Sequence, residues 1–186
     1  MKLQDLFKKK SLCDYVIYVS ILIGGIIIDQ FTKWLAVKFL MPIGSVPVIK
    51  IGGVEVINFT YVENRGAAFG MLKNAPWVFN TVSTVAIIVM LAYLFLGQAE
   101  SKLSGIALSM LVSGGIGNMI DRVTLRYVVD FIDFRIINFA VFNGADSFVC
   151  VGAGLLVLGM ILEMKEEMKK EEFKKTAAQH SEGDEE

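Results

Sequence analysis

A stretch of 21 residues without a charged side chain, residues 76–96, most constrains what this chain can fold into. As an α-helix this stretch rises about 31 Å, which matches the roughly 30 Å hydrocarbon core of a bilayer. The whole chain of 186 residues is 54% hydrophobic and only 20% charged, unlike an ordinary soluble domain. These features exclude a water-soluble fold and predict that the stretch crosses a membrane.

Three further apolar segments predict a bundle of four membrane-spanning helices. Residues 103–120 carry no charge, residues 145–162 carry only Asp146, and residues 15–40 are apolar as far as Asp29. The glycines of the first of these segments predict close helix packing. The N-terminal segment follows a run of lysines, as a secretion signal does, but no small-residue cleavage pattern comes after it. We therefore expect it to be retained as a span.

Lysines at the ends of the predicted spans indicate the orientation of the chain. They precede the first span, occur between the second and third spans at Lys102, and recur in the charged tail, residues 163–186. By the positive-inside rule these ends are cytoplasmic, so both termini share that side. The two longer connections, residues 41–75 and 121–144, then lie on the outer side. The tail alternates Lys with Glu, and we expect a solvated helix that frays into disorder.

The outer connections carry the signals of a small β-sheet. Residues 46–51 and 54–62 are rich in β-branched and aromatic side chains, and Gly52 and Gly53 between them are typical of a hairpin turn. Residues 127–134 are also β-prone and are too short and charged to span. The sequence therefore predicts an all-α membrane bundle of four transmembrane helices with a small extracytoplasmic β-sheet.

We expect this fold to form a single domain over residues 1–186, with its outer β-rich segment at residues 44–70.

The charge balance and the scarcity of histidine limit the chemistry that this chain can perform. The 18 basic and 19 acidic side chains nearly cancel, which gives no footprint for nucleic acid. The single histidine, His180, lies in the tail, so we expect no metal ion and no cofactor. Without a Ser–His or Cys–His arrangement on the outer side, hydrolytic chemistry there has to come from carboxylates.

Two groups of polar residues lie at the outer ends of the predicted spans. Asp29 and Lys33 share one helix face, so they can pair, and Lys33 can extend outward to the interface. The pair either ends the span or belongs to a site, because ionisable residues inside membranes are mostly functional. At the end of the third span, the spacing of Asn118, Asp121 and Arg122 favours a structural role.

Further candidates lie in the outer connections. Asn64 and Arg65, in the segment 64–70, can hydrogen-bond a substrate backbone, although the segment also fits a glycine-rich turn. Asp146 fits an N-terminal helix cap. If Asp130 and Asp146 meet, they cannot both ionise readily, and one acts as an acid while the other acts as a base. Spacing alone leaves this pairing open, because another outer acid is an equally good partner.

Four blocks of these residues resemble, in the same order, the motifs of bacterial lipoprotein signal peptidases, also called signal peptidase II. The resemblance covers about residues 16–162. Gly144 stands where the family often has a larger apolar residue, and Glu63 and Arg65 vary the surroundings of Asn64. The blocks are DQFTK at residues 29–33, NRGAAFG at 64–70, GNMIDR at 117–122 followed by VVDF at 128–131, and FNGADS at 142–147.

The resemblance implies an integral-membrane aspartyl endopeptidase that removes the signal peptide of prolipoproteins just before a diacylglyceryl-modified cysteine. It implies Asp130 and Asp146 as the catalytic pair, a site facing outward from the bacterial cytoplasmic membrane, no cofactor, and a hairpin that corresponds to the family's β cradle. We expect a monomer surrounded by membrane lipid. Residues matched as lining or supporting the site are Asn118, Arg122 and Asn143, with Asp29, Asn64 and Gly66 facing it and Lys33 and Asp121 supporting the fold around it.

Two other functions fit parts of the pattern. A small transporter or proton relay would use Asp29, Lys33 and the outer carboxylates for translocation, but the second and third spans carry no ionisable residue in their interiors. A scaffold protein would use the carboxylates only as helix caps, and it would tolerate a neutral substitution of Asp146. The peptidase is the favoured hypothesis.

Overall fold

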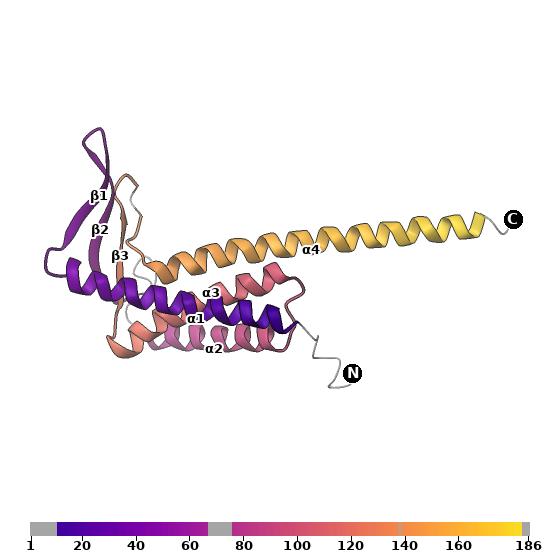
Figure 1. Ribbon diagram of the computed structural model, residues 1–186, viewed down its shortest axis with the longest axis horizontal. Coiled ribbons are helices and arrows are strands. Elements are labelled where there is room, and N and C mark those ends of the chain that lie inside the picture. Colours follow the sequence, from indigo (N-terminus) through magenta and orange to yellow (C-terminus); the bar gives the residue numbers. More distant parts are fainter. Residues whose placement is uncertain (1–10, 67–75, 138, 184–186) are drawn as a thin grey trace.

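The computed structural model describes residues 11–66, 76–137 and 139–183 of the chain. The helices form a bundle, and a three-stranded sheet lies at one end of it (Figure 1). The first helix begins, and the last helix ends, on the side opposite the sheet. In chain order the elements are α1 (Leu12–Leu35), continued by the π-helix η2 (Ala36–Leu40), β1 (Ser45–Ile51), β2 (Val54–Asn64), α2 (Pro76–Phe95), α3 (Lys102–Thr124), β3 (Val128–Phe134) and α4 (Gly144–Gly183).

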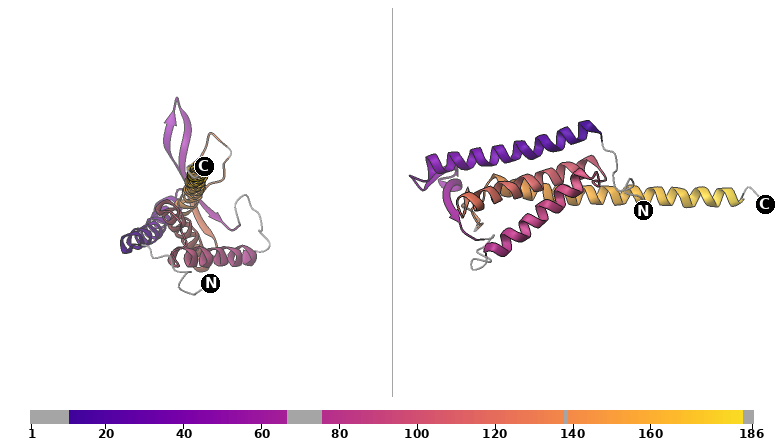
Figure 2. Two further views of the ribbon diagram at one scale, coloured as in Figure 1. Left: turned by 90° about the vertical axis from the view of Figure 1, so that its right-hand side faces the viewer. Right: turned by 90° about the horizontal axis from the view of Figure 1, so that it is seen from below.

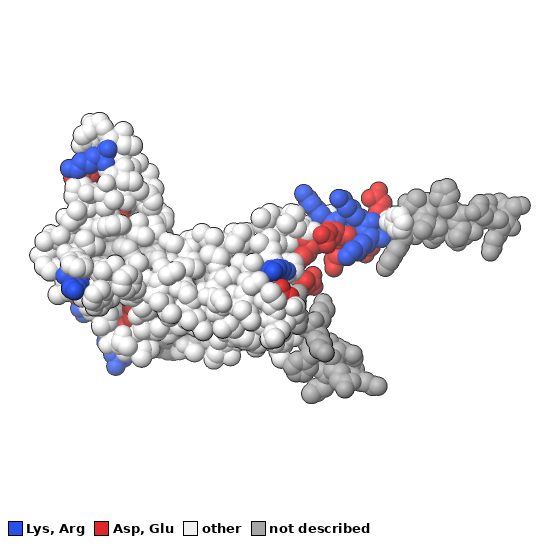
Figure 3. Space-filling view, viewed as in Figure 1, with Lys and Arg blue, Asp and Glu red and all other residues white. Residues whose placement is uncertain are grey.

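Three helices of the described part are long and apolar enough to cross a membrane. They are Leu12–Leu40, Lys102–Thr124 and Gly144–Phe173, and Asn80–Phe95 within α2 is a shorter apolar helix. Large apolar side chains cover the exposed helix faces, and an uncharged surface extends from the sheet to the projecting part of α4 (Figure 3). Such a surface suits contact with lipid, and the chain is therefore a multi-pass membrane protein.

Helix α3 packs against each of the other three helices, and small residues allow its close contacts. A Cβ atom added to Gly114 would collide with the backbone carbonyl oxygen of Ala145 in α4, and one added to Gly105 would collide with the ring of Tyr18 in α1. Glycines commonly permit such close approach between membrane helices. The predicted close packing is confirmed.

Helix α2 meets α3 at the end away from the sheet and diverges from it toward the sheet (Figure 2). The divergence leaves an apolar groove of about 330 Å³. Because the groove follows the last turns of α3, it lies at the same level as the sheet end of the bundle. Its lining consists of Thr84, Ile87 and Ile88 from α2 and Ile116, Met119, Ile120, Val123 and Thr124 from α3.

Helix α4 is a single helix of 40 residues that includes most of the charged tail. Its second half projects beyond the bundle (Figure 1). Glu and Lys recur there at spacings of three and four, as at Glu166 and Lys170, which favours continued helix. The expectation of a helix in the tail is confirmed as far as Gly183, and the side chains of residues 164–173 are exposed. Residues 184–186 lie outside the described part.

The sheet is antiparallel, with the strand order β1-β2-β3. Ile51 pairs with Val54 across the tip of the hairpin, and both residues between them have positive φ, 56° at Gly52 and 85° at Gly53. This is the geometry of a type I′ turn, which glycine adopts without strain. The predicted hairpin and the predicted third β-prone segment are both confirmed.

Strand β3 connects the sheet to the helices. Its first four residues are buried, and Val129 and Phe131 pack against η2. Asn64 at the end of β2 pairs with Val128 of β3. This register brings the end of the hairpin close to Asp130, two residues further along β3.

Replacing Gly114 by Ala is expected to lower stability, because the new Cβ has no room against the backbone of α4. The cost of such overpacking is about 1–3 kcal/mol. Gly154→Ala is the matched control, because nothing lies within 4 Å of a Cβ at that position of α4. Thermal unfolding in detergent or lipid measures both variants, and equal unfolding temperatures would contradict the close contact.

Candidate active site

The first turn of α4 holds a reciprocal cap that contains one of the candidate acids. The side-chain Oδ1 of Asn143 accepts the backbone N–H of Asp146 at 3.0 Å, and Oδ2 of Asp146 accepts the backbone N–H of Asn143 at 3.2 Å. This is the arrangement of a capping box, and an anionic carboxylate at a helix N-terminus is stabilised by the helix dipole. The prediction that Asp146 caps this helix is confirmed.

Asp130 lies in β3 beside this cap and is 1% exposed. Its Oδ1 accepts from Nδ2 of Asn143 at 2.7 Å, and its Oδ2 accepts from Nδ2 of Asn64 at 2.9 Å. Asn143 therefore contacts both Asp130 and Asp146, and it brings together two acids from different elements.

Burial raises the pKa of Asp130 to about 7. The negative charge of Asp146 raises the pKa further, whereas the hydrogen bonds from Asn64 and Asn143 and the positive charge of Lys33 lower it. Asp130 is thus poised to hold a proton near neutral pH. Asp146 is only half-buried, and it accepts the side-chain amide of Asn118 and the backbone N–H of Asn143.

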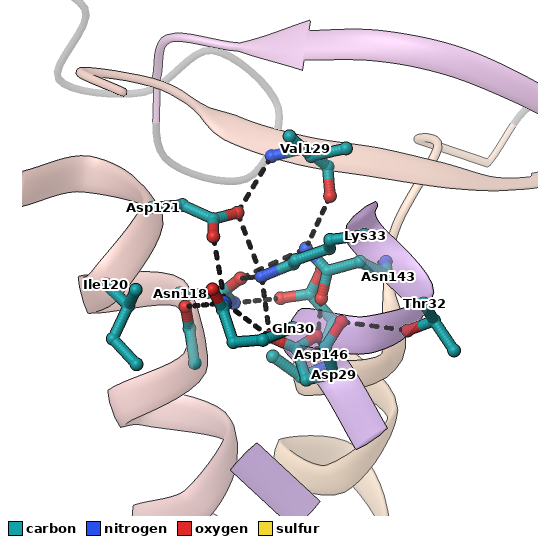
Figure 4. Close-up of polar contacts among 12 residues, drawn as sticks. Asp29, Gln30, Thr32, Lys33, Asn118, Ile120, Asp121, Val129, Asn143 and Asp146 are labelled. Carbon is teal, nitrogen blue, oxygen red and sulfur yellow. Dashed lines mark hydrogen bonds and ion pairs between the residues drawn. The ribbon is translucent and has the colours of Figure 1, made fainter. Parts of the chain in front are cut away.

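Asn118 of α3 connects Asp146 to the interior of the bundle. Its Nδ2 donates to Oδ1 of Asp146 at 2.8 Å, and its Oδ1 accepts from Nδ2 of Asn143 at 3.0 Å and from Nζ of Lys33 at 2.9 Å (Figure 4). The structure thus places the Asn118 amide in direct contact with a candidate catalytic acid.

Lys33 points into the bundle, and the outward extension that the sequence allows does not occur. Its side chain is 3% exposed, and Nζ lies 2.9 Å from Oδ2 of Asp29 and 3.0 Å from Oδ2 of Asp121. The physical reason is that two carboxylates and the Asn118 oxygen satisfy all three N–H donors of the ammonium group. Such a cluster offsets the cost of desolvation that otherwise drives a lysine to the membrane surface.

The two carboxylates that bind Lys33 also bind backbone near the candidate acids. Oδ1 of Asp29 accepts the N–H of Ala145 at 2.8 Å, and Oδ2 of Asp121 accepts the N–H of Val129 at 3.0 Å. Asp29 therefore links α1 to the first turn of α4, and Asp121 links α3 to β3.

Gln30 is a member of this network that the sequence analysis left without a role. Its Nε2 donates to Oδ1 of Asp121 at 3.0 Å, to the carbonyl oxygen of Gly117 at 3.1 Å and to Oδ2 of Asp29 at 3.3 Å. The sign of this role in the sequence is that an amide side chain directly follows an intramembrane aspartate. Its partners lie on another helix, and the sequence could not indicate them.

Of the segment 64–70, only residues 64–66 lie in the described part of the chain. The N–H of Gly66 donates to Oδ1 of Asn64 at 3.1 Å, which turns Nδ2 of Asn64 toward Asp130. Arg65 is exposed and pairs with Glu63 at 2.8 Å. Asn64 thus contacts Asp130 and is oriented by Gly66, whereas Arg65 lies on the surface.

Two other charged residues nearby, Arg122 and Asp133, differ in what they contact. Arg122 contacts the carbonyl oxygen of Asn118 at 3.4 Å, and its charge acts on Asp130, Asp146 and Asp121. Asp133 instead binds Thr60 and Arg135 within the sheet. In the described part of the chain, no three His, Cys, Asp or Glu side chains are arranged to hold a metal ion.

Comparison with known proteins identifies the family to which this chain belongs. Residues 21–162 match the family described as signal peptidase (SPase) II. The chain belongs to the signal peptidase II family. Its members are membrane aspartic proteases that remove signal peptides from prolipoproteins, which is the function that the four sequence blocks imply.

Individual relatives agree with this family. The chain is 52% identical over 140 residues to a lipoprotein signal peptidase of Caldanaerobacter subterraneus subsp. tengcongensis, which covers 75% of this chain and 91% of the relative. It is 42% identical over 148 residues to a lipoprotein signal peptidase of Clostridium tetani, with coverage of 78% and 92%. A solved bacterial membrane enzyme at 2.3 Å resolution has a TM-score of 0.71 and 30% identity, covering 80% of this chain and 90% of that one.

Substitutions of Asn143 separate its two contacts. Asn143→Ala removes both the cap and the amide donor to Asp130, so we expect a stability loss of about 0.5–2 kcal/mol and a loss of peptidase activity. Asn143→Ser keeps an oxygen that caps the helix but lacks the amide donor. It is expected to retain more stability than Asn143→Ala while losing similar activity, as measured by thermal unfolding and prolipoprotein cleavage. Full activity of Asn143→Ser would show that the donor to Asp130 is dispensable.

Proposed function

We propose that Asp130 and Asp146 are the catalytic pair of this signal peptidase II and that they cut prolipoproteins just before the diacylglyceryl-modified cysteine. The observation that carries this proposal is the placement of Asn143. Its side chain binds Asp130 while its backbone N–H binds Asp146, so a single residue contacts both a buried acid and a helix-capping carboxylate. Paired carboxylates in unlike environments are suited to divide acid and base roles.

The environments assign the roles. Asp146 is the general base that removes a proton from water, and the water oxygen attacks the carbonyl carbon of the scissile bond. Asp130, whose pKa burial raises to about 7, donates its proton to the carbonyl oxygen. The tetrahedral intermediate then collapses as Asp146 gives its proton to the leaving amine and Asp130 recovers the proton from the hydroxyl group. Both acids return to their starting states without a covalent adduct.

The remaining polar residues prepare the pair for this chemistry. Asn64, oriented by Gly66, holds Asp130 from the hairpin side, and Asn118 holds Asp146 from α3. The positive charge of Arg122 stabilises negative charge that develops on the substrate or the two acids.

The arrangement of the bundle supports an outward-facing site. In this proposal α2, whose 20 residues suffice for a span, crosses the membrane as the fourth helix. Helix α1 begins and α4 ends on the side opposite the sheet, which the lysines of the tail make cytoplasmic. The sheet is then the β cradle on the outer surface of the bacterial cytoplasmic membrane. The single domain acts as a monomer.

A site at the outer ends of the helices suits a lipidated substrate. The acyl chains of a diacylglyceryl cysteine reside in the outer leaflet, so the adjacent peptide bond arrives near the outer ends of the helices. The groove between α2 and α3 lies along the same turns of α3 that carry Asn118 and Arg122, and it offers apolar surface at that level. Each acyl methylene held in the bilayer rather than in water contributes about 0.8 kcal/mol to anchoring the substrate at this level.

Neutral substitution of either acid tests the pair. Asp130→Asn and Asp146→Asn are each expected to lower kcat by about 10²- to 10⁴-fold, because each removes a proton-transfer group. Cleavage of a diacylglycerated prolipoprotein by purified protein in lipid measures the effect. Asp133→Asn is the matched control, because Asp133 lies on the same strand but binds Thr60 and Arg135. Near-parent cleavage by Asp130→Asn or Asp146→Asn would remove that residue from the pair.

The pH profile tests the assignment of the acid. Because Asp130 acts in its protonated form and its pKa is raised to about 7, kcat/KM is expected to fall as the pH rises through about 7. Asn64→Ala removes a hydrogen bond that lowers the pKa of Asp130, so the alkaline limb is expected to move to higher pH in this variant. An alkaline limb that stays in place in Asn64→Ala would show that Asp130 does not control it.

A further inference from the structure

Lys33 lies at the branch point of two chains of polar contacts (Figure 4). Each chain ends at the backbone N–H of the residue that precedes one of the proposed catalytic acids. The ammonium group lies 2.9 Å from Oδ2 of Asp29 and 3.0 Å from Oδ2 of Asp121. These two aspartates come from different helices, α1 and α3. A single buried cation therefore fixes two carboxylates relative to each other.

The first chain of contacts leads to Asp146. Oδ2 of Asp29 binds Lys33, and Oδ1 of the same carboxylate accepts the backbone N–H of Ala145 at 2.8 Å. Ala145 is fully buried and directly precedes Asp146 in the first turn of α4. The position of this turn relative to α1 thus depends on Asp29.

The second chain leads to Asp130 in the same manner. Oδ2 of Asp121 binds Lys33 and accepts the backbone N–H of Val129 at 3.0 Å. Val129 is buried and directly precedes Asp130 in β3. Gln30 donates to the other oxygen of Asp121 and so holds this carboxylate in one orientation.

A third contact fixes the orientation of the side-chain amide of Asn118. Nζ of Lys33 donates to Oδ1 of Asn118, which leaves the Nδ2 group of this amide to donate to Asp146. A lysine ammonium can only donate, so the opposite orientation of the Asn118 amide would be repelled.

We propose that Lys33 is a positioning residue that sets the relative placement of Asp130 and Asp146, because it holds the two carboxylates that bind the backbone N–H before each of them. The inference rests on the proposed catalytic pair. Misplacement of reacting groups by about 1 Å can cost about 10²-fold in rate, so loss of this link is expected to lower kcat by about that factor. KM should stay near the parent value, because Lys33 touches neither the groove nor the hairpin surface in the described contacts.

The alternative is that Lys33 only neutralises buried charge. Lys33→Met leaves Asp29 and Asp121 without their cation, and such a variant is destabilised under either hypothesis. The double variant Lys33→Met/Asp121→Asn separates the two, because it restores the net charge of the cluster while the link stays broken. Lys38→Met is the matched control, since Lys38 is exposed one turn further along and lies over the ring of Trp34.

The experiment measures kcat, KM and the unfolding temperature of these variants with a diacylglycerated prolipoprotein in lipid. We expect the double variant to recover part of the unfolding temperature that Lys33→Met loses, because one unpaired carboxylate remains instead of two, while its kcat stays about 10²-fold low at near-parent KM, and we expect Lys38→Met to match the parent. Recovery of kcat together with stability would overturn the proposal. Asp121→Leu removes the acceptor of the Val129 N–H while Lys33 stays paired with Asp29, so it answers the question even if Lys33→Met does not fold, and a parental kcat for Asp121→Leu would also overturn the proposal.

Asp130→Asn in the same assay distinguishes the two levels of the account. If Asp130→Asn is inactive while the double variant has a parental kcat, the catalytic pair stands and the role of Lys33 fails. If Asp130→Asn is itself active, the proposed catalytic pair fails, and the inference about Lys33 fails with it.

Discussion

The burial of one ammonium group, that of Lys33, is the interaction on which the rest of the structure depends. Removing an ion from water costs several kcal/mol, so a buried lysine is stable only where acceptors surround it. Here Asp29, Asp121 and Asn118 supply one acceptor for each of its three donors. Because these acceptors come from α1 and α3, the requirement holds the two helices in one relative position. The same carboxylates accept a backbone N–H of β3 and a backbone N–H in the first turn of α4.

In the proposed mechanism, the roles of the two acids follow from their unlike environments. Asp130 lies in a buried strand, and burial raises its pKa to about 7. Asp146 lies half-buried in the first turn of a helix, where it accepts the side-chain amide of Asn118 and the backbone N–H of Asn143. Asn143 joins the two environments. A proton relay would need ionisable groups at several depths, whereas this cluster lies at one end of the bundle.

Local features of the sequence predicted much of the fold. Charge-free length identified the helices, two glycines identified the hairpin, and the position of Asp146 at the start of an apolar segment identified the cap of α4. These signals succeed because each depends on residues that are close together in the chain.

The features that the sequence could not supply depend on distant partners. Spacing paired Lys33 with Asp29 but gave no sign of Asp121 on another helix, so the inward direction of the lysine was not predicted. The role of Gln30 was missed for the same reason. The meeting of Asp130 with Asp146 depends on the placement of Asn143, and only the resemblance to a family suggested it before the structure did.

The most direct test of the central claim is exact-mass analysis of the products that the purified protein in lipid makes from one prolipoprotein. The precursor is supplied in two forms, with its cysteine diacylglycerated or unmodified. The account predicts a single cut of the modified form, which leaves the diacylglyceryl cysteine as the new N-terminus, and a much slower reaction of the unmodified form. Cleavage at another bond, or equal rates for the two forms, would contradict it.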